Sequence, residues 1–256
     1  MSGREPSPDA MASFATWAAL AESCQLLSNN AGTLARIIVV PILLSMSIIF
    51  IAPLVSPLWQ DVLMTLLFLL GWILFSVSWL RLLLLDDRSI RRFFPRLERR
   101  HLRVAGYALL LILIDLPLVF TWHFLDEEPQ AAQTTEVLYW LAYIFLGFIK
   151  LRFAFVYPAA AIDERYSLKL AWQHSHSASL PLLTAFLIAI VAPFAGLSYG
   201  LSELMDKEQW AYISWALWHV SVWMIEAIYL AIIAIAFRCC AGWVPPPNKA
   251  ILERFE

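Results

Sequence analysis

The feature that most constrains this sequence is a block of arginines between two long apolar runs. The runs are Val62–Leu85 and Val104–Leu125, and the block, Arg88–Arg103, sets seven arginines against the single acid Glu98. An apolar run of about 20 residues can cross the hydrocarbon core of a bilayer as a helix. Lys and Arg close to the ends of such spans stay on the cytoplasmic side. The pattern therefore predicts a span on each side of a cytoplasmic loop.

The composition agrees with a membrane location. The 256 residues are 61% hydrophobic and 15% charged, whereas soluble domains are about 45–50% apolar and about 25% charged. So much apolar surface exceeds what one soluble core of this size can bury. We therefore exclude an ordinary soluble domain.

Six segments are long and apolar enough to span a bilayer. They are Leu34–Leu54, Val62–Leu85, Val104–Leu125, Val137–Ile162, Leu180–Leu201 and Trp210–Phe237. The loop after the fourth segment holds Arg165 and Lys169, whereas the loop after the third holds the acidic run Asp126–Glu128. This asymmetry of basic residues predicts that both termini are cytoplasmic. The predicted fold is an all-α, multi-pass membrane protein with six transmembrane helices and cytoplasmic interfacial helices.

Prolines and aspartates recur at one spacing. Pro41, Pro117 and Pro193 lie in alternate spans, and 117 − 41 and 193 − 117 both give 76. Asp87 and Asp163 follow the second and fourth spans, and 163 − 87 is again 76. The spacing favours a threefold repeat of helical hairpins. The alternative is that any six-span chain with even loops looks periodic.

Each repeat unit would begin with an amphipathic segment that lies along the membrane surface. In the first unit, Phe14, Trp17, Leu20, Cys24 and Leu27 recur at helical spacing. The predicted organisation is a disordered cytoplasmic tail (1–13), one membrane domain (14–242) with units 14–87, 88–163 and 164–241, and a cytoplasmic C-terminal tail (243–256).

Charged residues inside the spans are the candidate functional residues, because ionisable groups at membrane depth are costly and often functional. They are Asp115, Lys150, Arg152, Glu226 and Arg81. One hypothesis is structural pairing of an acid with Lys150 or Arg152. A second is contact of Arg81 and Arg152 with lipid phosphates. A third is a transport site at the level of Asp115, Lys150 and Glu226.

The arginine block is the candidate contact for anionic lipid headgroups on the cytoplasmic side. Its members are Arg88, Arg91, Arg92, Arg96, Arg99, Arg100 and Arg103. The position of the block between two spans argues against nucleic acid as its partner. The sequence contains no nucleophile elbow, HExxH, Walker or dinucleotide motif. We accordingly predict no cofactor, no metal site and no catalytic residues.

The segment Phe153–Leu180 resembles an element of bacterial multi-pass membrane proteins. The matching residues are Pro158–Asp163, Ala171, Trp172 and Ser175, and the end of the second span, WLRLLLLDD, looks similar. The family comprises the membrane domain fused to some glycerophosphodiester phosphodiesterases and its uncharacterised stand-alone relatives. The resemblance implies a six-helix membrane domain in the bacterial inner (plasma) membrane. It implies no phosphodiesterase chemistry, because that domain is missing from this chain.

These observations predict a non-enzymatic scaffold or accessory protein that contacts lipid, with a protein partner in the membrane as a second candidate contact. A small transporter or channel that uses the intramembrane charges is the first alternative. An intramembrane lipid-processing enzyme is the second.

Overall fold

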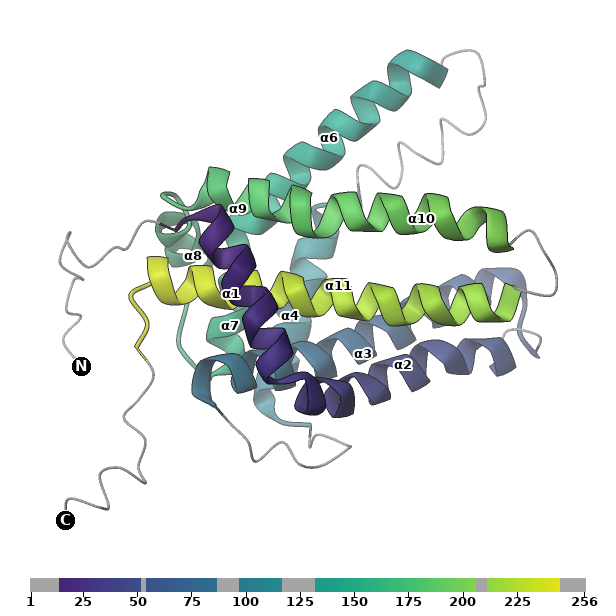
Figure 1. Ribbon diagram of the computed structural model, residues 1–256, viewed down its shortest axis with the longest axis horizontal. Coiled ribbons are helices and arrows are strands. Elements are labelled where there is room, and N and C mark those ends of the chain that lie inside the picture. The colour runs from purple at the N-terminus through teal and green to yellow at the C-terminus, as the bar shows by residue number, and fades with distance from the viewer. Residues whose placement is uncertain (1–13, 52–53, 87–96, 117–131, 206–210, 245–256) are drawn as a thin grey trace.

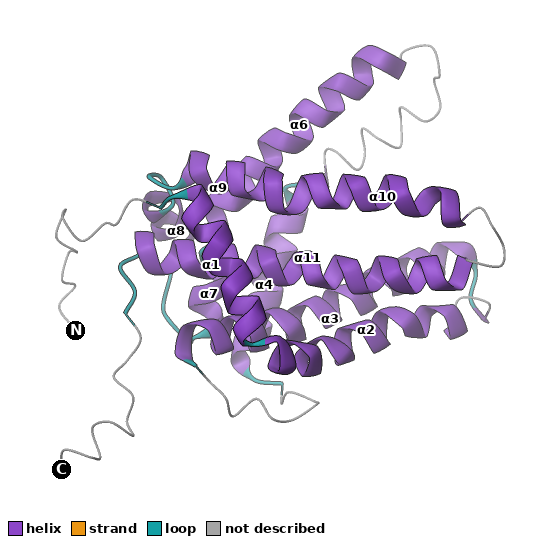
Figure 2. Cartoon of the chain, in the orientation of Figure 1, coloured by secondary structure: helices purple, strands orange, loops and turns teal. Residues whose placement is uncertain are grey.

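The computed structural model describes residues 14–51, 54–86, 97–116, 132–205 and 211–244, and within these ranges every regular element is a helix (Figure 2). The elements are α1 (Thr16–Asn29), α2 (Ala31–Ile51), α3 (Pro57–Leu85), α4 (Arg99–Leu113), α6 (Ala132–Phe153), α7 (Val156–Ala161), α8 (Leu168–His174), α9 (Ser179–Phe186), the π-helix η4 (Leu187–Val191), α10 (Ala192–Met205) and α11 (Ala211–Cys240). The all-α prediction is confirmed for the part of the chain that the structure describes.

Four helical stretches in the described ranges are long and apolar enough to cross a membrane: Val62–Leu85, Leu141–Ala161, Ser179–Leu201 and Ile213–Cys240. They coincide with the second, fourth, fifth and sixth predicted spans. A fifth candidate is the pair α1 and α2, which are bent by 85° relative to each other. The multi-pass membrane character is thus confirmed. The prediction of six spans exceeds the four or five that the described residues contain. Residues 117–125 of the third predicted span lie outside the described residues.

Two of the predicted spans are interrupted in the structure. The fourth breaks into α6 and α7 at a turn over Ala154 and Phe155. Pro158 explains this break, because it has no N–H with which to bond the carbonyl of Ala154. The fifth contains η4 directly before Pro193, and such a π-bulge rearranges the hydrogen bonds around a proline. Pro41, in contrast, lies inside the unbroken α2.

Helix α4 joins the end of the predicted interfacial segment to the start of the third predicted span. The helix begins at Arg99 and runs without a break through Val104 to Leu113. A capping box starts it: the Glu98 carboxylate accepts the His101 N–H, and His101 Nδ1 accepts the Glu98 N–H at 3.1 Å. Residues 87–96, which hold the first part of the arginine block, lie outside the described residues.

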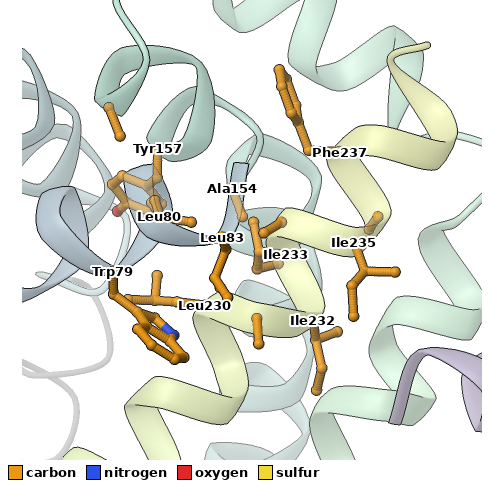
Figure 3. Packing of buried hydrophobic residues seen from close by; sticks show 14 of the residues in the cluster. Trp79, Leu80, Leu83, Ala154, Tyr157, Leu230, Ile232, Ile233, Ile235 and Phe237 are labelled. Atoms are coloured by element: carbon orange, nitrogen blue, oxygen red, sulfur yellow. The ribbon is translucent and has the colours of Figure 1, made fainter. Parts of the chain in front are cut away.

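Helices α3, α7 and α11 form the centre of the bundle (Figure 1). Trp79 and Leu80 of α3, Tyr157 of α7, and Leu230 and Ile233 of α11 belong to one buried cluster (Figure 3). Burial of such side chains is favourable relative to water, and in a bilayer it is tight packing between helices that holds them together. Figure 1 shows the outer half of α6 diverging from the other helices.

Helices α2 and α3 pack closely at Gly71. A Cβ added there would lie 3.2 Å from Cα of Pro41 and 3.4 Å from the Trp223 ring. Small residues allow membrane helices to approach in this way. Gly71 therefore fixes the contact between the first two spans and brings α11 against both.

Each of the three central helices is followed by a residue with a positive φ. The positive-φ residues Asp86 (φ 48°), Asp163 (φ 63°) and Gly242 (φ 62°) follow α3, α7 and α11. The left-handed residue after α3 is thus Asp86, so the structural spacing to Asp163 is 163 − 86, or 77, rather than the 76 counted from Asp87. Asp87 itself lies outside the described residues.

The amphipathic segments of the first and third predicted units also share a pattern of burial. Ala19, Ser23 and Leu27 are the buried residues of α1, and Ala171, Ser175 and Ser179 are buried 152 positions later. The hydroxyls of Ser23 and Ser175 donate to the carbonyls of Leu20 and Trp172, each three residues earlier. Since 152 is twice 76, these contacts follow the spacing seen in the prolines.

Candidate functional site

A cluster of charged and aromatic side chains lies where α3, α6, α7 and α11 meet the end of α4. Lys150 Nζ of α6 donates a hydrogen bond to Asp115 Oδ2, two residues after α4, at 2.8 Å. Both side chains are partly exposed, at 30% and 29%. The structure therefore brings together two of the five predicted intramembrane residues as an ion pair.

Glu226 of α11 is held on the other side of this cluster. Its Oε2 accepts a hydrogen bond from Trp72 Nε1 of α3 at 3.0 Å. Lys150 lies within electrostatic range of Glu226 as well. The Tyr157 ring meets Trp72 edge to face, with centroids 5.0 Å apart. Two carboxylates thus share the surroundings of one ammonium, and an indole N–H satisfies the second carboxylate.

Arg152 lies two residues beyond Lys150 but belongs to a different site. The residue is only 5% exposed. Its Nη1 donates to Ser179 Oγ at 2.8 Å and lies 3.3 Å from His176 Nδ1, and its Nη2 donates to the Trp172 carbonyl at 2.5 Å. The guanidinium also stacks 4.2 Å from the centroid of the Trp172 ring. We call these four residues the Arg152 site.

The charge of the Arg152 site is not balanced by a carboxylate within the described ranges. The ion pairs found there join other residues. In addition, Arg152 Nε is buried and finds no hydrogen-bond partner in the part of the chain that the structure describes. The predicted pairing of an acid with Lys150 or Arg152 is therefore seen at Lys150, whereas neutral groups surround Arg152.

Arg81, the fifth predicted residue, lies near the inner end of α3. Its Nη1 is 3.4 Å from the carbonyl of Ala161, the last residue of α7. A cation at the C-terminal end of a helix is favoured by the helix dipole. This contact ties α3 to α7 and separates Arg81 from the cluster around Lys150.

The arginine block is partly engaged within the molecule. Arg100 pairs with Glu98 and lies 3.3 Å from Asp163, and Arg103 lies 3.6 Å from the same carboxylate. Arg99 is exposed. The other four arginines, Arg88, Arg91, Arg92 and Arg96, lie outside the described residues. Arg100 and Arg103 therefore link the start of α4 to the end of α7, a contact that the sequence did not predict.

The segment around α8 has further polar contacts. Tyr166 Oη lies 2.7 Å from His174 Nδ1, and Tyr107 Oη donates to the Tyr166 carbonyl at 3.2 Å. Burial lowers the pKa of His174 and raises the pKa of Tyr166. Burial also lowers the pKa of His101, partly offset by Glu98. These groups favour a neutral polar network at this end of the bundle.

Helix α1, at the start of the described residues, contacts α9 and α11. Arg238, near the end of α11, pairs with Glu22 of α1, and Thr16 Oγ1 donates to the Pro181 carbonyl of α9 at 3.1 Å. The first amphipathic segment is thus anchored on the last two predicted spans. Nothing in the local sequence signals these contacts, because they join residues more than 160 positions apart.

Sequence reasoning missed Trp72, Trp172 and Ser179, which complete the two clusters. Tryptophans in a membrane protein suggest interfacial anchors, and a serine in a helix suggests a bond to its own backbone. Only the fold shows that their polar atoms face charges. In the described residues no group of three or more His, Cys, Asp or Glu side chains could hold a metal ion. Comparisons with protein-family models, curated proteins and solved structures find no match for this chain.

Proposed function

We propose that this chain is a non-enzymatic scaffold or accessory protein of the bacterial inner membrane that contacts anionic lipid, with a partner protein in the membrane as a second candidate contact. The observation that carries the proposal is the direct pairing of Lys150 with Asp115 at 2.8 Å. A charge that is engaged by another helix of the same bundle stabilises the bundle. The paired intramembrane charges then stabilise the packing of the helices, and the outer surface of the bundle makes the contacts with lipid and a partner protein.

The proposal includes six spans with both termini in the cytoplasm. Two observations support it. The basic residues Arg81, Arg100, Arg103 and Arg238 all make their contacts at the ends of helices that the charge pattern assigns to one side. The bent pair α1 and α2 resembles a surface helix that leads into a span. We also propose, from the sequence resemblance alone, that this chain is related to the membrane domains fused to some glycerophosphodiester phosphodiesterases.

Native mass spectrometry of the gently solubilised full chain tests the proposed function. We expect bound anionic lipid, a co-purifying membrane protein, or both. A lone monomer free of lipid and partner, from a sample that remains folded, contradicts the proposal. Orientation is tested separately by labelling single cysteines placed at Lys169 and at Glu127 in sealed cells, where we expect only the second to react from outside.

A small transporter is the second candidate, and one observation favours it. Lys150 and Asp115 keep 30% and 29% exposure within the protein, and Glu226 lies within electrostatic range of the same lysine. Three ionisable groups at one site can exchange a proton or cation between them. Proteoliposomes with wild-type protein and the Glu226→Gln variant test this. Cation or proton flux that the variant loses would favour transport over the scaffold.

A further inference from the structure

We propose that the Arg152 site binds a phosphate group, with the headgroup of an anionic phospholipid as the source that the surroundings favour. The inference deepens the proposed lipid contact and rests on it, because it takes α8 to lie at the lipid–water interface. It assigns that contact to a buried arginine outside the arginine block.

The first argument is the balance of charge. Arg152 is 5% exposed, and the groups within reach are a hydroxyl, a carbonyl and an imidazole. A guanidinium taken out of water without an anion loses much of its solvation energy. Dipoles restore only part of this loss, so the site attracts an anion.

The second argument is the unused donor. Arg152 Nε is buried and has no hydrogen-bond partner among the described residues. Most buried polar groups in proteins do have one. A planar guanidinium presents its N–H groups as a fork that matches the oxygens of a phosphate. A phosphate oxygen at Nε would satisfy the remaining donor.

The third argument is the placement of α9. Arg152 donates to the hydroxyl of Ser179, which is the first residue of that eight-residue helix. The N-terminus of a helix carries partial positive charge and favours anions. The Ser179 N–H already bonds the His176 carbonyl, and Pro181 has no N–H. The helix end therefore adds only a small favourable term beside the guanidinium. The Trp172 carbonyl near the end of α8 offsets this only with a partial charge.

The fourth argument concerns the source of the phosphate. Trp172 covers the guanidinium yet is itself 41% exposed, and His176 beside it is exposed. Tryptophan side chains concentrate at the level of lipid headgroups. An anion that reaches Arg152 past these two residues comes from the interface. Free phosphate shares the same chemistry, so the experiment must separate the two sources.

The test compares four full-length proteins: the wild type, Arg152→Gln, His176→Glu and the control Lys169→Gln. Lys169 is an exposed cation on the same helix, α8. His176→Glu places a carboxylate beside Arg152 and so supplies the anion from within the chain. Each protein is incorporated into nanodiscs of equal parts phosphatidylglycerol and phosphatidylcholine, and retained lipid is measured by native mass spectrometry.

We expect the wild type and Lys169→Gln to retain phosphatidylglycerol in preference to phosphatidylcholine. Arg152→Gln and His176→Glu should lower this preference roughly tenfold, the scale of a lost charge-assisted bond. His176→Glu should also melt at a higher temperature than the wild type in lipid-free detergent, because its new carboxylate pairs with Arg152. If Arg152→Gln fails to fold, His176→Glu decides the question.

Two outcomes overturn the inference. One is equal retention of phosphatidylglycerol by the wild type and folded His176→Glu, which leaves the general lipid contact standing. The other is a His176→Glu variant that is no more stable than the wild type without lipid. Inorganic phosphate that stabilises the lipid-stripped wild type but not His176→Glu supports the site and assigns it to free phosphate. A folded wild type that retains neither lipid nor a partner protein contradicts the proposed function itself.

Discussion

Lys150 and Arg152 lie two residues apart in α6, yet the fold treats their charges in opposite ways. Lys150 contacts the carboxylate of Asp115 at 2.8 Å, whereas Arg152 contacts Ser179, His176 and the Trp172 carbonyl. Residues two apart on a helix point to different faces. One face of α6 therefore meets the charged cluster of the bundle, and the other meets the segment around α8 and α9.

The difference teaches that a basic residue in an apolar segment is explained by the element it faces. The ammonium of Lys150 is a compact charge that one carboxylate compensates, and the pair holds α6 to the end of α4. The guanidinium of Arg152 has several donors in a fixed plane, and it holds α8 and α9 to α6. The first contact neutralises charge, whereas the second distributes hydrogen bonds and leaves the charge in place.

Removal of Lys150 should give the largest effect. Lys150→Ala leaves Asp115 without its partner, and we expect a loss of about 2–4 kcal/mol in the free energy of unfolding, reduced from a fully buried pair by the partial exposure. The double variant Asp115→Asn, Lys150→Ala should recover part of that loss. Unfolding is measured by steric trapping in detergent or bicelles, with Lys169→Ala as the control, whose effect should stay within about 0.5 kcal/mol. Losses that simply add would show that the two side chains are energetically independent.

Exchange of the two side-chain types should sharpen the comparison. Arg152→Lys keeps the charge but loses the fork that reaches Ser179 and the Trp172 carbonyl together, so we expect a loss of about 1–3 kcal/mol. Lys150→Arg keeps a cation opposite Asp115 and should change stability by less than about 1 kcal/mol. The same unfolding assay measures both. Equal effects at the two positions would mean that the geometry of the guanidinium has no special role.

The sequence predicted the general fold and the list of charged candidates, because both depend on local composition. A run such as Val62–Leu85 has one stable solution in a bilayer, namely a helix. The same reasoning located Asp115, Lys150 and Glu226 as unusual. Proline effects were only partly predictable: Pro158 and Pro193 accompany breaks, whereas α2 continues through Pro41.

The partners of the charges were not predictable from the sequence, because they depend on which helices become neighbours. Asp115 and Glu226 were equal candidates for Lys150, and the fold gives the direct contact to Asp115 and a Trp72 bond to Glu226. Arg152 was grouped with Lys150 by its position in the chain. Its contacts to α8 and α9 depend on the turn at Ala154–Phe155 and on the tertiary packing beyond it. The contact of Glu22 with Arg238 was hidden for the same reason.

Glu226 tests whether Lys150 serves one acid or two. Glu226→Gln keeps an oxygen that can accept the Trp72 N–H but removes the negative charge near Lys150. If Asp115 alone compensates Lys150, we expect a change of about 1 kcal/mol or less in either direction. Trp72→Phe is the matched variant, because it removes the donor and leaves the carboxylate. A loss at Glu226→Gln as large as that at Lys150→Ala would make the three residues one inseparable unit.

The smallest expected effect is a dependence on pH confined to the segment around α8. Burial lowers the pKa of His174 in the folded protein, and its ring lies 2.7 Å from Tyr166 Oη. Between the unfolded and the folded pKa the unfolded chain binds more protons, so stability increases with pH there. The contribution is complete above about pH 6.5, the unfolded value, and is lost as the pH falls through the lowered folded value. Melting temperatures at about pH 7.5 and about pH 5 should therefore differ more for the wild type than for His174→Gln. The corresponding difference in the free energy of unfolding should be less than about 1 kcal/mol. His101, whose pKa is lowered too, leaves a residual dependence in both proteins. An acid-induced loss that is identical in His174→Gln and the wild type would place the pH-sensitive group elsewhere and remove this contrast between the segment around α8 and the cluster around Lys150.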